Sequence, residues 1–354
     1  MSDPDLIGTL VADRFSIQKR IGAGSFGVIY LAVDIVTNIE VAVKLEKKDN
    51  IFARLRLRHE SKICHGLRGN EGFCQAFYFG DHLGIYNVLV MELMGPSLND
   101  LFDAHPQNFS LKTVLQIADQ VLVRLNTLHE IGIVHRDIKP GNFVMGLGEK
   151  SGVVHSVDFG LSKLYRCKRT LEHYHVAEDL MAGTARFSSI TTHQGVFQTR
   201  RDDMEALAYM LIYFLKGELP WQGIQEKNCK IKNNLTLQKK ERTTIESLCE
   251  GLPKEFAEFL RYARSLKYNQ KPDLDYTRKL FHDLYVARGY DTVQGTMWDW
   301  DSLDVAESGS EYEYESELEP ESEPVSVPAP AAEVMPVRDS PQSTAHSSRS
   351  ANHH

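Results

Sequence analysis

The chain has 354 residues, of which 42% are hydrophobic, so it is long enough to bury one large core or two smaller ones. Of its 48 acids and 40 bases, 11 acids and 2 bases lie from Ser302 onward, which leaves residues 1–301 with a net charge of about +1. A nearly neutral part gives no argument for nucleic-acid binding, which would need a basic face, so we expect no nucleic-acid partner.

Apolar runs and cysteine spacing exclude other classes. The longest apolar run, Ala206 to Leu215, is too short to span a bilayer. The acidic, polar N-terminus does not have the form of a secretory leader. Five cysteines without C-x-x-C spacing predict reduced thiols in an intracellular protein, not a disulfide framework or a zinc site.

A glycine-rich segment follows the first predicted strand. Its G-x-G-x-x-G spacing lets the backbone close over phosphates and offer them N–H groups. Dinucleotide-binding folds share this spacing but need a helix directly after it. Residues 28–33 are instead β-branched and aromatic and predict a second strand. The pattern favours a phosphate-covering flap made of Ile21, Gly22, Ala23, Gly24, Ser25, Phe26, Gly27, Val28 and Ile29.

Lys44 lies in the third predicted strand, Val41–Leu45. It would face the flap and hold the α- and β-phosphates, although a cation at a strand end is common by itself. Such a lysine needs an acidic partner, and we choose Glu60 from the predicted helix over residues 52–67. The alternative for Glu60 is a surface pair with basic neighbours one helical turn away.

The segment Leu89–Pro96 begins as an apolar strand and ends at a Gly-Pro break. We expect a hinge here between a β-rich lobe and a helical lobe. The Glu92 carbonyl and the Met94 N–H would pair with adenine, and Met91 would narrow the back of the pocket. Met91 can also be a core residue, and the two interpretations are compatible.

The octet His135–Asn142 matches H-R-D-x-x-x-x-N at every fixed position. Because proline lacks an N–H and glycine weakens helices, the octet predicts a rigid loop. Such a loop can present Asp137, Lys139 and Asn142 towards one point. Phosphoryl transfer from ATP needs a carboxylate for the substrate hydroxyl, a cation at the γ-phosphate and an amide oxygen for a metal ion. The alternative, a solvated polar loop, explains an isolated aspartate better than the whole octet.

A second metal ligand is predicted at Asp158, where a short strand ends in Asp-Phe-Gly. Mg²⁺ favours one or two carboxylates together with phosphate oxygens. This tripeptide alone is a common turn, but 16 residues after Asn142 it becomes a specific signal.

Residues 203–215 are apolar almost all round and predict the buried axis of the helical lobe. Asp203 at its start would bind N–H groups of the octet or cap the helix.

These motifs, in this order, resemble those of eukaryotic protein kinases, and more finely those of the casein kinase 1 family. The resemblance covers about residues 9–300, and like that family the chain lacks Ala-Pro-Glu after its activation segment. The runs that carry the finer resemblance are Met91–Leu98, Lys139–Phe143, Gly183–Phe187, Arg200–Glu205 and Leu219–Gly223.

The resemblance implies an α+β, two-lobe kinase fold, with the β-rich lobe at about residues 9–94 and the mainly helical lobe at about 95–300. It implies a monomeric, cytoplasmic or nuclear Ser/Thr kinase that uses ATP and Mg²⁺. Its partners would be protein substrates with an acidic or phosphorylated residue three positions before the acceptor. It also implies that Arg186, assisted by Lys230 and Lys232, holds that anion, which suits the bidentate guanidinium.

The chain departs from the family pattern in the activation segment. Glu178 and Asp179 stand where the family usually has basic residues, which argues against strict phosphate priming. Thr191 and Ala208 replace a usual asparagine and glycine. One alternative is a pseudokinase scaffold, although no lysine, aspartate or glycine of the motifs is missing. The other is a relative of tau-tubulin or vaccinia-related kinases, and the run Leu219–Gly223 argues against it.

Residues 301–354 are rich in Ser, Glu and Pro and poor in large apolar residues, and this composition predicts a disordered tail. The chain end has no prenylation motif, so we expect no lipid anchor there. Four tail serines follow a glutamate by three residues, which predicts a tethered substrate unless the spacing arose by chance. They are Ser310, Ser316, Ser322 and Ser326.

Overall fold

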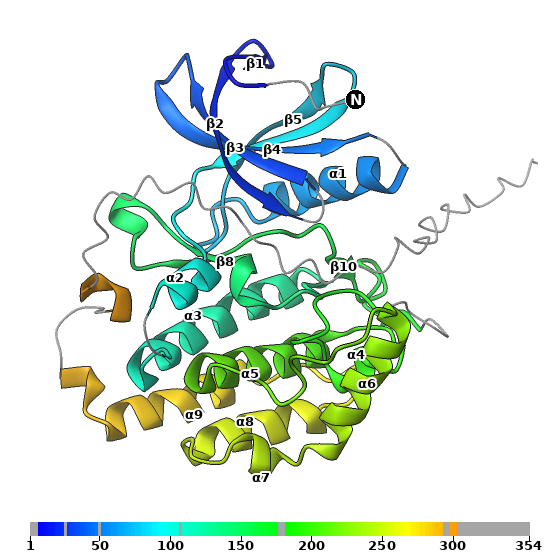
Figure 1. Ribbon diagram of the computed structural model, residues 1–354, viewed down its shortest axis with the longest axis vertical. Helices are drawn as coiled ribbons and strands as arrows, with labels where there is room; N and C mark the ends of the chain where they lie inside the picture. Colours follow the sequence, from blue (N-terminus) through cyan, green and yellow to red (C-terminus); the bar gives the residue numbers. More distant parts are fainter. Residues whose placement is uncertain are drawn as a thin grey trace, which may run out of the picture.

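The computed structural model describes residues 6–24, 27–48, 51–105, 108–175, 181–292 and 298–302. Within them the chain forms two lobes, a β-rich lobe with one helix and a mainly helical lobe (Figure 1). This arrangement confirms the predicted fold class. Ser25, Phe26, Glu178, Asp179 and the tail from residue 303 lie outside the described residues, and the proposed domain limits stay predictions.

The β-rich lobe is built on an antiparallel six-stranded sheet. Alternating side chains of the strands, such as Val43 and Val88, fill its core and are fully buried. Helix α1 (Ile51–Gly66) packs against β4, β5 and β6. The strands, in sheet order, are β1 (Leu10–Val11), β2 (Phe15–Gly24), β3 (Gly27–Asp34), β4 (Ile39–Lys47), β6 (Tyr86–Glu92) and β5 (Ala76–His82).

The sheet register places the described part of the glycine flap beside Lys44. Strand β3 pairs with β4 so that Ile29 lies opposite Lys44 and Val28 opposite Leu45. The hairpin of β2 and β3 closes where Gly24 lies opposite Gly27. A regular antiparallel pairing therefore places the flap and the lysine on neighbouring strands, as the sequence predicts.

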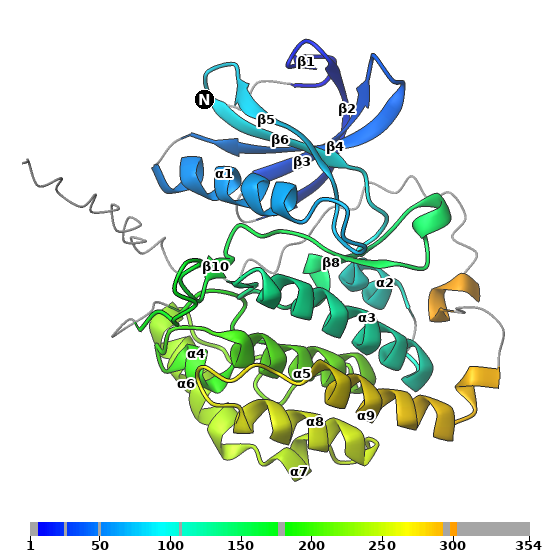
Figure 2. The same cartoon turned by 180° about the vertical axis from the view of Figure 1, so that it is seen from behind.

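The helical lobe is organised around α5 (Arg200–Lys216), in which every residue from Asp202 to Phe214 is buried. This confirms the predicted buried axis. Helix α3 contacts α5 and α9, and α5 contacts α8, so these helices are stacked as Figure 2 shows. The other helices are α2 (Leu98–Ala104), α3 (Leu111–Glu130), α4 (Ile190–His193), α6 (Cys229–Arg242), α7 (Ile245–Leu248), α8 (Lys254–Ser265) and α9 (Leu274–Ala287).

Short elements between α3 and α4 shape the face of this lobe that meets the β-rich lobe. Two small sheets pair β7 with β10 and β8 with β9. Their strands are β7 (Ile133–Val134), β8 (Phe143–Met145), β9 (Val154–Ser156) and β10 (Lys163–Leu164). The 3₁₀ turns are η1 (Pro140–Asn142), η2 (Gly148–Lys150), η3 (Tyr290–Thr292) and η4 (Asp299–Ser302).

In the described part of the chain, no helix has the length and apolar character needed to cross a membrane.

Candidate active site

Lys44 joins three elements at the interface of the lobes. Its Nζ lies 2.8 Å from Glu60 on α1 and 3.0 Å from Asp158, which follows β9. Lys44 and Glu60 are buried, so the structure brings together the lysine and the acid chosen from the sequence. Burial alone would lower the pKa of Lys44, but the Asp158 and Glu60 carboxylates outweigh it and hold this pKa above its ordinary value.

Asp158 remains ionised in this arrangement. Burial acts to raise the pKa of its carboxyl group, but the nearby Lys44 ammonium outweighs burial and lowers it to about 2. Its backbone has a positive φ of 58°, which is strained for a residue with a side chain. An ionised carboxylate held in this way is suited to a divalent cation.

The octet loop gathers its polar side chains at Asp137. The Asp137 Oδ2 atom lies 2.9 Å from both the Asn142 Nδ2 and the Lys139 Nζ. Its Oδ1 atom accepts the backbone N–H and the hydroxyl of Thr184, at 2.9 and 2.8 Å. Because the amide nitrogen of Asn142 is used for Asp137, the amide oxygen is the atom left for a metal ion.

The carboxylate of Asp203 fixes the backbone at the start of this loop. Its carboxylate accepts the backbone N–H groups of His135 and Arg136, each at 2.9 Å, and binds the His129 ring at 2.8 Å. Arg136 has a positive φ of 73°, and the bond to Asp203 holds it in that strained conformation. Asp203 therefore binds the octet, and the capping box of α5 is made by Asp202 with Thr199.

The flap needs glycine at one position for reasons of space. A Cβ atom at Gly27 would lie 2.3 Å from the carbonyl oxygen of Leu45 on β4. At Gly22 a Cβ atom would meet Ile29 only at ordinary distances, the nearest being 3.8 Å. Nothing in the described chain requires Gly22 to be a glycine. Close approach of a phosphate to the backbone would explain why glycine occurs at this position.

The hinge is fixed from both lobes. The Glu92 N–H donates to Gln75 at 2.8 Å, and the Gly95 N–H donates to Met145 at 2.8 Å. Met91 is half-buried, with its sulfur 4.0 Å from that of Cys74. The pairing of adenine with the Glu92 carbonyl and the Met94 N–H stays a prediction.

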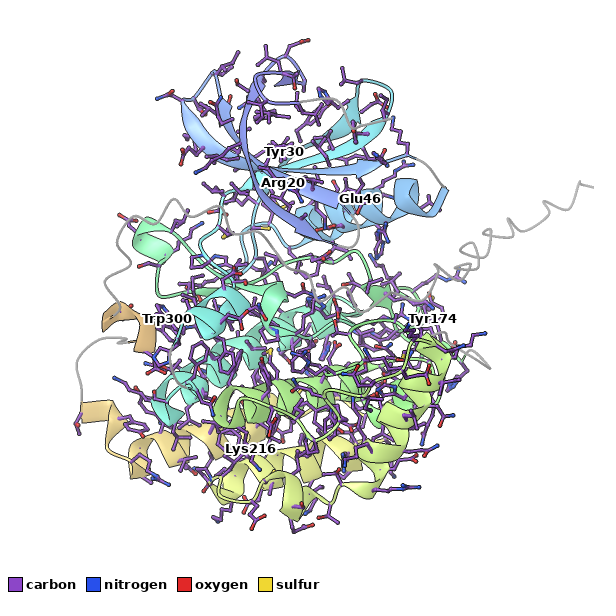
Figure 3. The ribbon with its side chains drawn as sticks, viewed as in Figure 1. Arg20, Tyr30, Glu46, Tyr174, Lys216 and Trp300 are labelled. Atoms are coloured by element: carbon purple, nitrogen blue, oxygen red, sulfur yellow. The ribbon has the colours of Figure 1, made fainter. Side chains whose placement is uncertain are left out.

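Two residues of the site were not identified from the sequence. Thr184 binds Asp137 from 47 residues away, and no local pattern reveals such a contact. Glu46 lies two residues after Lys44, so the alternation of strand β4 places both on one face. Its side chain is buried beside α1, with Oε1 3.4 Å from the Nε of Arg56, and it is labelled in Figure 3. Burial raises the pKa of Glu46 to about 7.

The residues proposed for the substrate anion lie on two parts of the helical lobe. Arg186 precedes α4, and its guanidinium lies 5.6 Å from the centre of the Tyr213 ring. Lys230 is exposed and Lys232 half-buried, both in the first turns of α6, which contacts α4. A joint anion site of these three cations stays a prediction.

A family model described as protein kinase domain matches residues 15–276, which is most of the chain. The chain belongs to this family. The buried lysine with its two carboxylates and the loop around Asp137 all lie within the matched residues. These residues fit a magnesium–nucleotide complex, since the oxygen ligands of Asn142 and Asp158 are those that Mg²⁺ prefers, and Lys44 supplies a cation for phosphate.

Proposed function

We propose that this kinase transfers the γ-phosphoryl group of ATP to serine or threonine in acidic or phosphorylated protein substrates, as casein kinase 1 enzymes do. The observation that carries the proposal is the meeting of Lys139, Asn142 and Thr184 at one carboxylate, that of Asp137. Magnesium-bound ATP supplies the phosphoryl group and the metal ion that neutralises charge on the phosphates.

The residues of the chain then have separate tasks. Lys44 holds the α- and β-phosphates, and Glu60 keeps its ammonium group in place. Asn142 and Asp158 hold the metal ion. Asp137 orients the substrate hydroxyl and accepts its proton, while Lys139 lies beside it for the γ-phosphate.

The substrate preference is supported by the resemblance to casein kinase 1 in five runs of sequence and by the position of Arg186. Arg186 follows Thr184 by two residues, so the segment that binds Asp137 also carries the proposed anion-binding guanidinium. A pseudokinase scaffold is the alternative function. The complete set of Lys44, Asp137, Asn142 and Asp158 supports catalysis over that alternative.

A peptide array tests this proposal with the full chain and labelled ATP. The peptides carry Ser, Thr or Tyr as acceptor, and Asp, phosphoserine, Ala or Arg three residues before it. Transfer to Ser or Thr, strongest after Asp or phosphoserine, would support the proposal. Transfer to Tyr, or a preference for Arg, would contradict it, and nucleotide binding without transfer to any peptide would favour the scaffold.

A further inference from the structure

Lys240 on α6 is a fully buried lysine. Its Nζ donates to the carbonyl oxygens of Ala185 at 2.8 Å and Ser188 at 2.5 Å. The same nitrogen lies 5.0 Å from the ring centres of Tyr209 and Trp221. It thus joins α6 to the segment between Asp137 and α4. The sequence alone predicts no role for Lys240.

The segment held by Lys240 is a tight turn, residues 184–188. The Thr184 carbonyl accepts the backbone N–H groups of Phe187 and Ser188, each at 3.0 Å. The Trp221 Nε1–H donates to the Arg186 carbonyl at 2.7 Å. Carbonyl groups 185, 186 and 188 are therefore all bound from within the lobe, which fixes the backbone on both sides of Arg186.

The turn is also bonded to the octet loop. Thr184 binds Asp137 through its N–H and hydroxyl. Gly183, just before it, has a φ of +97°, and a Cβ atom there would lie 2.2 Å from the Arg136 carbonyl oxygen. One rigid segment therefore links the carboxylate that orients the acceptor hydroxyl to the guanidinium proposed for the substrate anion.

An amine in this apolar place is costly, because burial disfavours its charged form. Burial lowers the pKa of Lys240 well below its ordinary value, although Glu205 acts in the opposite direction; Arg264 lowers it further. The His193 ring, from α4, also binds the Ala185 carbonyl, at 3.2 Å. A methionine would fill the same space without this cost. A neutral amine still has two N–H groups, so both carbonyl bonds persist in either protonation state.

We propose that Lys240 is a positioning residue for the protein substrate: it holds the carbonyl groups of Ala185 and Ser188 so that Arg186 is presented at a fixed distance from Asp137. The substrate part of this inference rests on the proposed function. The alternative is a lysine that only stabilises the helical lobe.

The experiment compares Lys240→Met, which removes the donor, with Lys240→Gln, which keeps two N–H groups. Phe256→Leu, in the core of α8 and in contact with Phe281, is the matched control for lost stability away from the turn. Hydrogen–deuterium exchange of residues 184–189 is measured in all full-length variants. We expect faster exchange there in Lys240→Met, partial protection in Lys240→Gln, and wild-type exchange in Phe256→Leu.

Kinetics provide the second measurement. Lys240→Met should raise KM for an acidic peptide by about tenfold, with KM for ATP unchanged, and reduce the preference for acidic over neutral peptides. Lys240→Gln should restore part of the preference, and Phe256→Leu should keep all of it. If Lys240→Met fails to fold, Trp221→Phe, which removes the donor to the Arg186 carbonyl and part of a buried ring, should show the same changes to a smaller degree, with Phe256→Leu again as the control for lost packing.

The inference is overturned if exchange at residues 184–189 stays at the wild-type rate without the donor. It is also overturned if Lys240→Met and Phe256→Leu lose stability and turnover alike while peptide preference is kept. A wild-type enzyme that transfers phosphate to no peptide would refute the proposed function instead. The exchange measurement would then still decide whether Lys240 positions the turn.

Discussion

The backbone N–H and the hydroxyl of Thr184 both donate to the same oxygen of Asp137, at 2.9 and 2.8 Å. The other oxygen is bound by the octet loop, so contacts on both sides fix the plane of the carboxylate. For the base that we propose, a fixed orientation means little reorganisation when the substrate arrives. The orientation of Asp137 therefore depends on Thr184, which lies 47 residues away along the chain.

Asp137→Asn should retain nucleotide binding and lower kcat by about 10²-fold or more, because an amide cannot accept the proton of the substrate hydroxyl. The measurement combines initial rates on a peptide with the Kd of a fluorescent ATP analogue. Asp283→Asn, on the exposed side of α9, is the control and should change neither quantity. Equal rates for Asp137→Asn and wild type would refute the assignment of the base.

The two flap glycines should respond differently to alanine. Gly27→Ala should lower the free energy of unfolding by about 2–4 kcal/mol, because its Cβ atom would collide with the Leu45 carbonyl. Gly22→Ala has space and should change the free energy of unfolding by less than about 1 kcal/mol. Its KM for ATP should nevertheless rise. Denaturant unfolding and ATP titration measure both effects, and a wild-type KM in Gly22→Ala would mean that phosphates do not approach this glycine.

Glu46 makes stability depend on pH near neutrality. Burial raises the pKa of its carboxyl group to about 7, so between its ordinary pKa and pH 7 the folded state binds a proton that the unfolded state has released. The stabilisation by the protonated form is complete below the ordinary pKa and is lost as the pH rises through about 7.

Glu46→Gln should therefore be more stable than wild type at pH 8, by about 2 kcal/mol, and should approach wild type at pH 5. A glutamine is neutral throughout and avoids the buried charge. Urea unfolding at the two pH values measures the difference, with Glu40→Gln as a control at an exposed position of the same strand. A difference between Glu46→Gln and wild type that did not vary with pH would contradict this account.

The sequence predicts the elements and the local constellations well, because both follow from spacing along the chain. Asp137 and Asn142 are five residues apart in a loop that Pro140 and Gly141 keep out of a regular helix, so their meeting needs no tertiary information. The glycine flap and Lys44 lie on consecutive strands, so a hairpin register is enough to bring them together.

Other contacts across long separations could not be predicted in this way, although the contact of Asp203 with the octet was one of two roles expected for that residue. The bonds from Thr184 to Asp137 and from Lys240 to Ala185 span 47 and 55 residues and depend on how α4, α5 and α6 pack. No local sequence pattern indicates that Lys240 is buried, because the other basic residues of α6 surround it and most of them are exposed. Only the packed lobe distinguishes it from its neighbours.

The C-terminal end of the described chain is anchored on α3. Asp299 accepts the N–H and the hydroxyl of Ser110, the N-cap of α3, at 2.6 and 2.7 Å. Trp300 packs against Phe109 at 5.2 Å between ring centres and stacks on Trp298 (Trp300 is labelled in Figure 3). Both tryptophans are buried, so this short segment belongs to the folded kinase.

A chain that stops after Thr292 should be less stable than one that stops after Ser302 by about 2–4 kcal/mol. It loses two buried aromatic side chains and the carboxylate bound to the α3 N-cap. Urea unfolding of the two chains and of the full chain is the measurement. The chain ending at Ser302 serves as the control and should match the full chain. Equal stability of all three would show that the anchor contributes nothing.

The chain ending at Ser302 also isolates the effect of the tail on activity. If the tail serines that follow glutamate are substrates, the tether keeps them at an effective concentration of about millimolar near the site. Each phosphate adds a charge of about −1.5 to −2 and would strengthen binding to Arg186 and Lys232, so autophosphorylation should slow the enzyme. Removing the tail should raise the rate on a peptide, and phosphatase treatment should raise it in the full chain only. Equal rates for the truncated, dephosphorylated and autophosphorylated enzymes would show that the tail does not occupy the site.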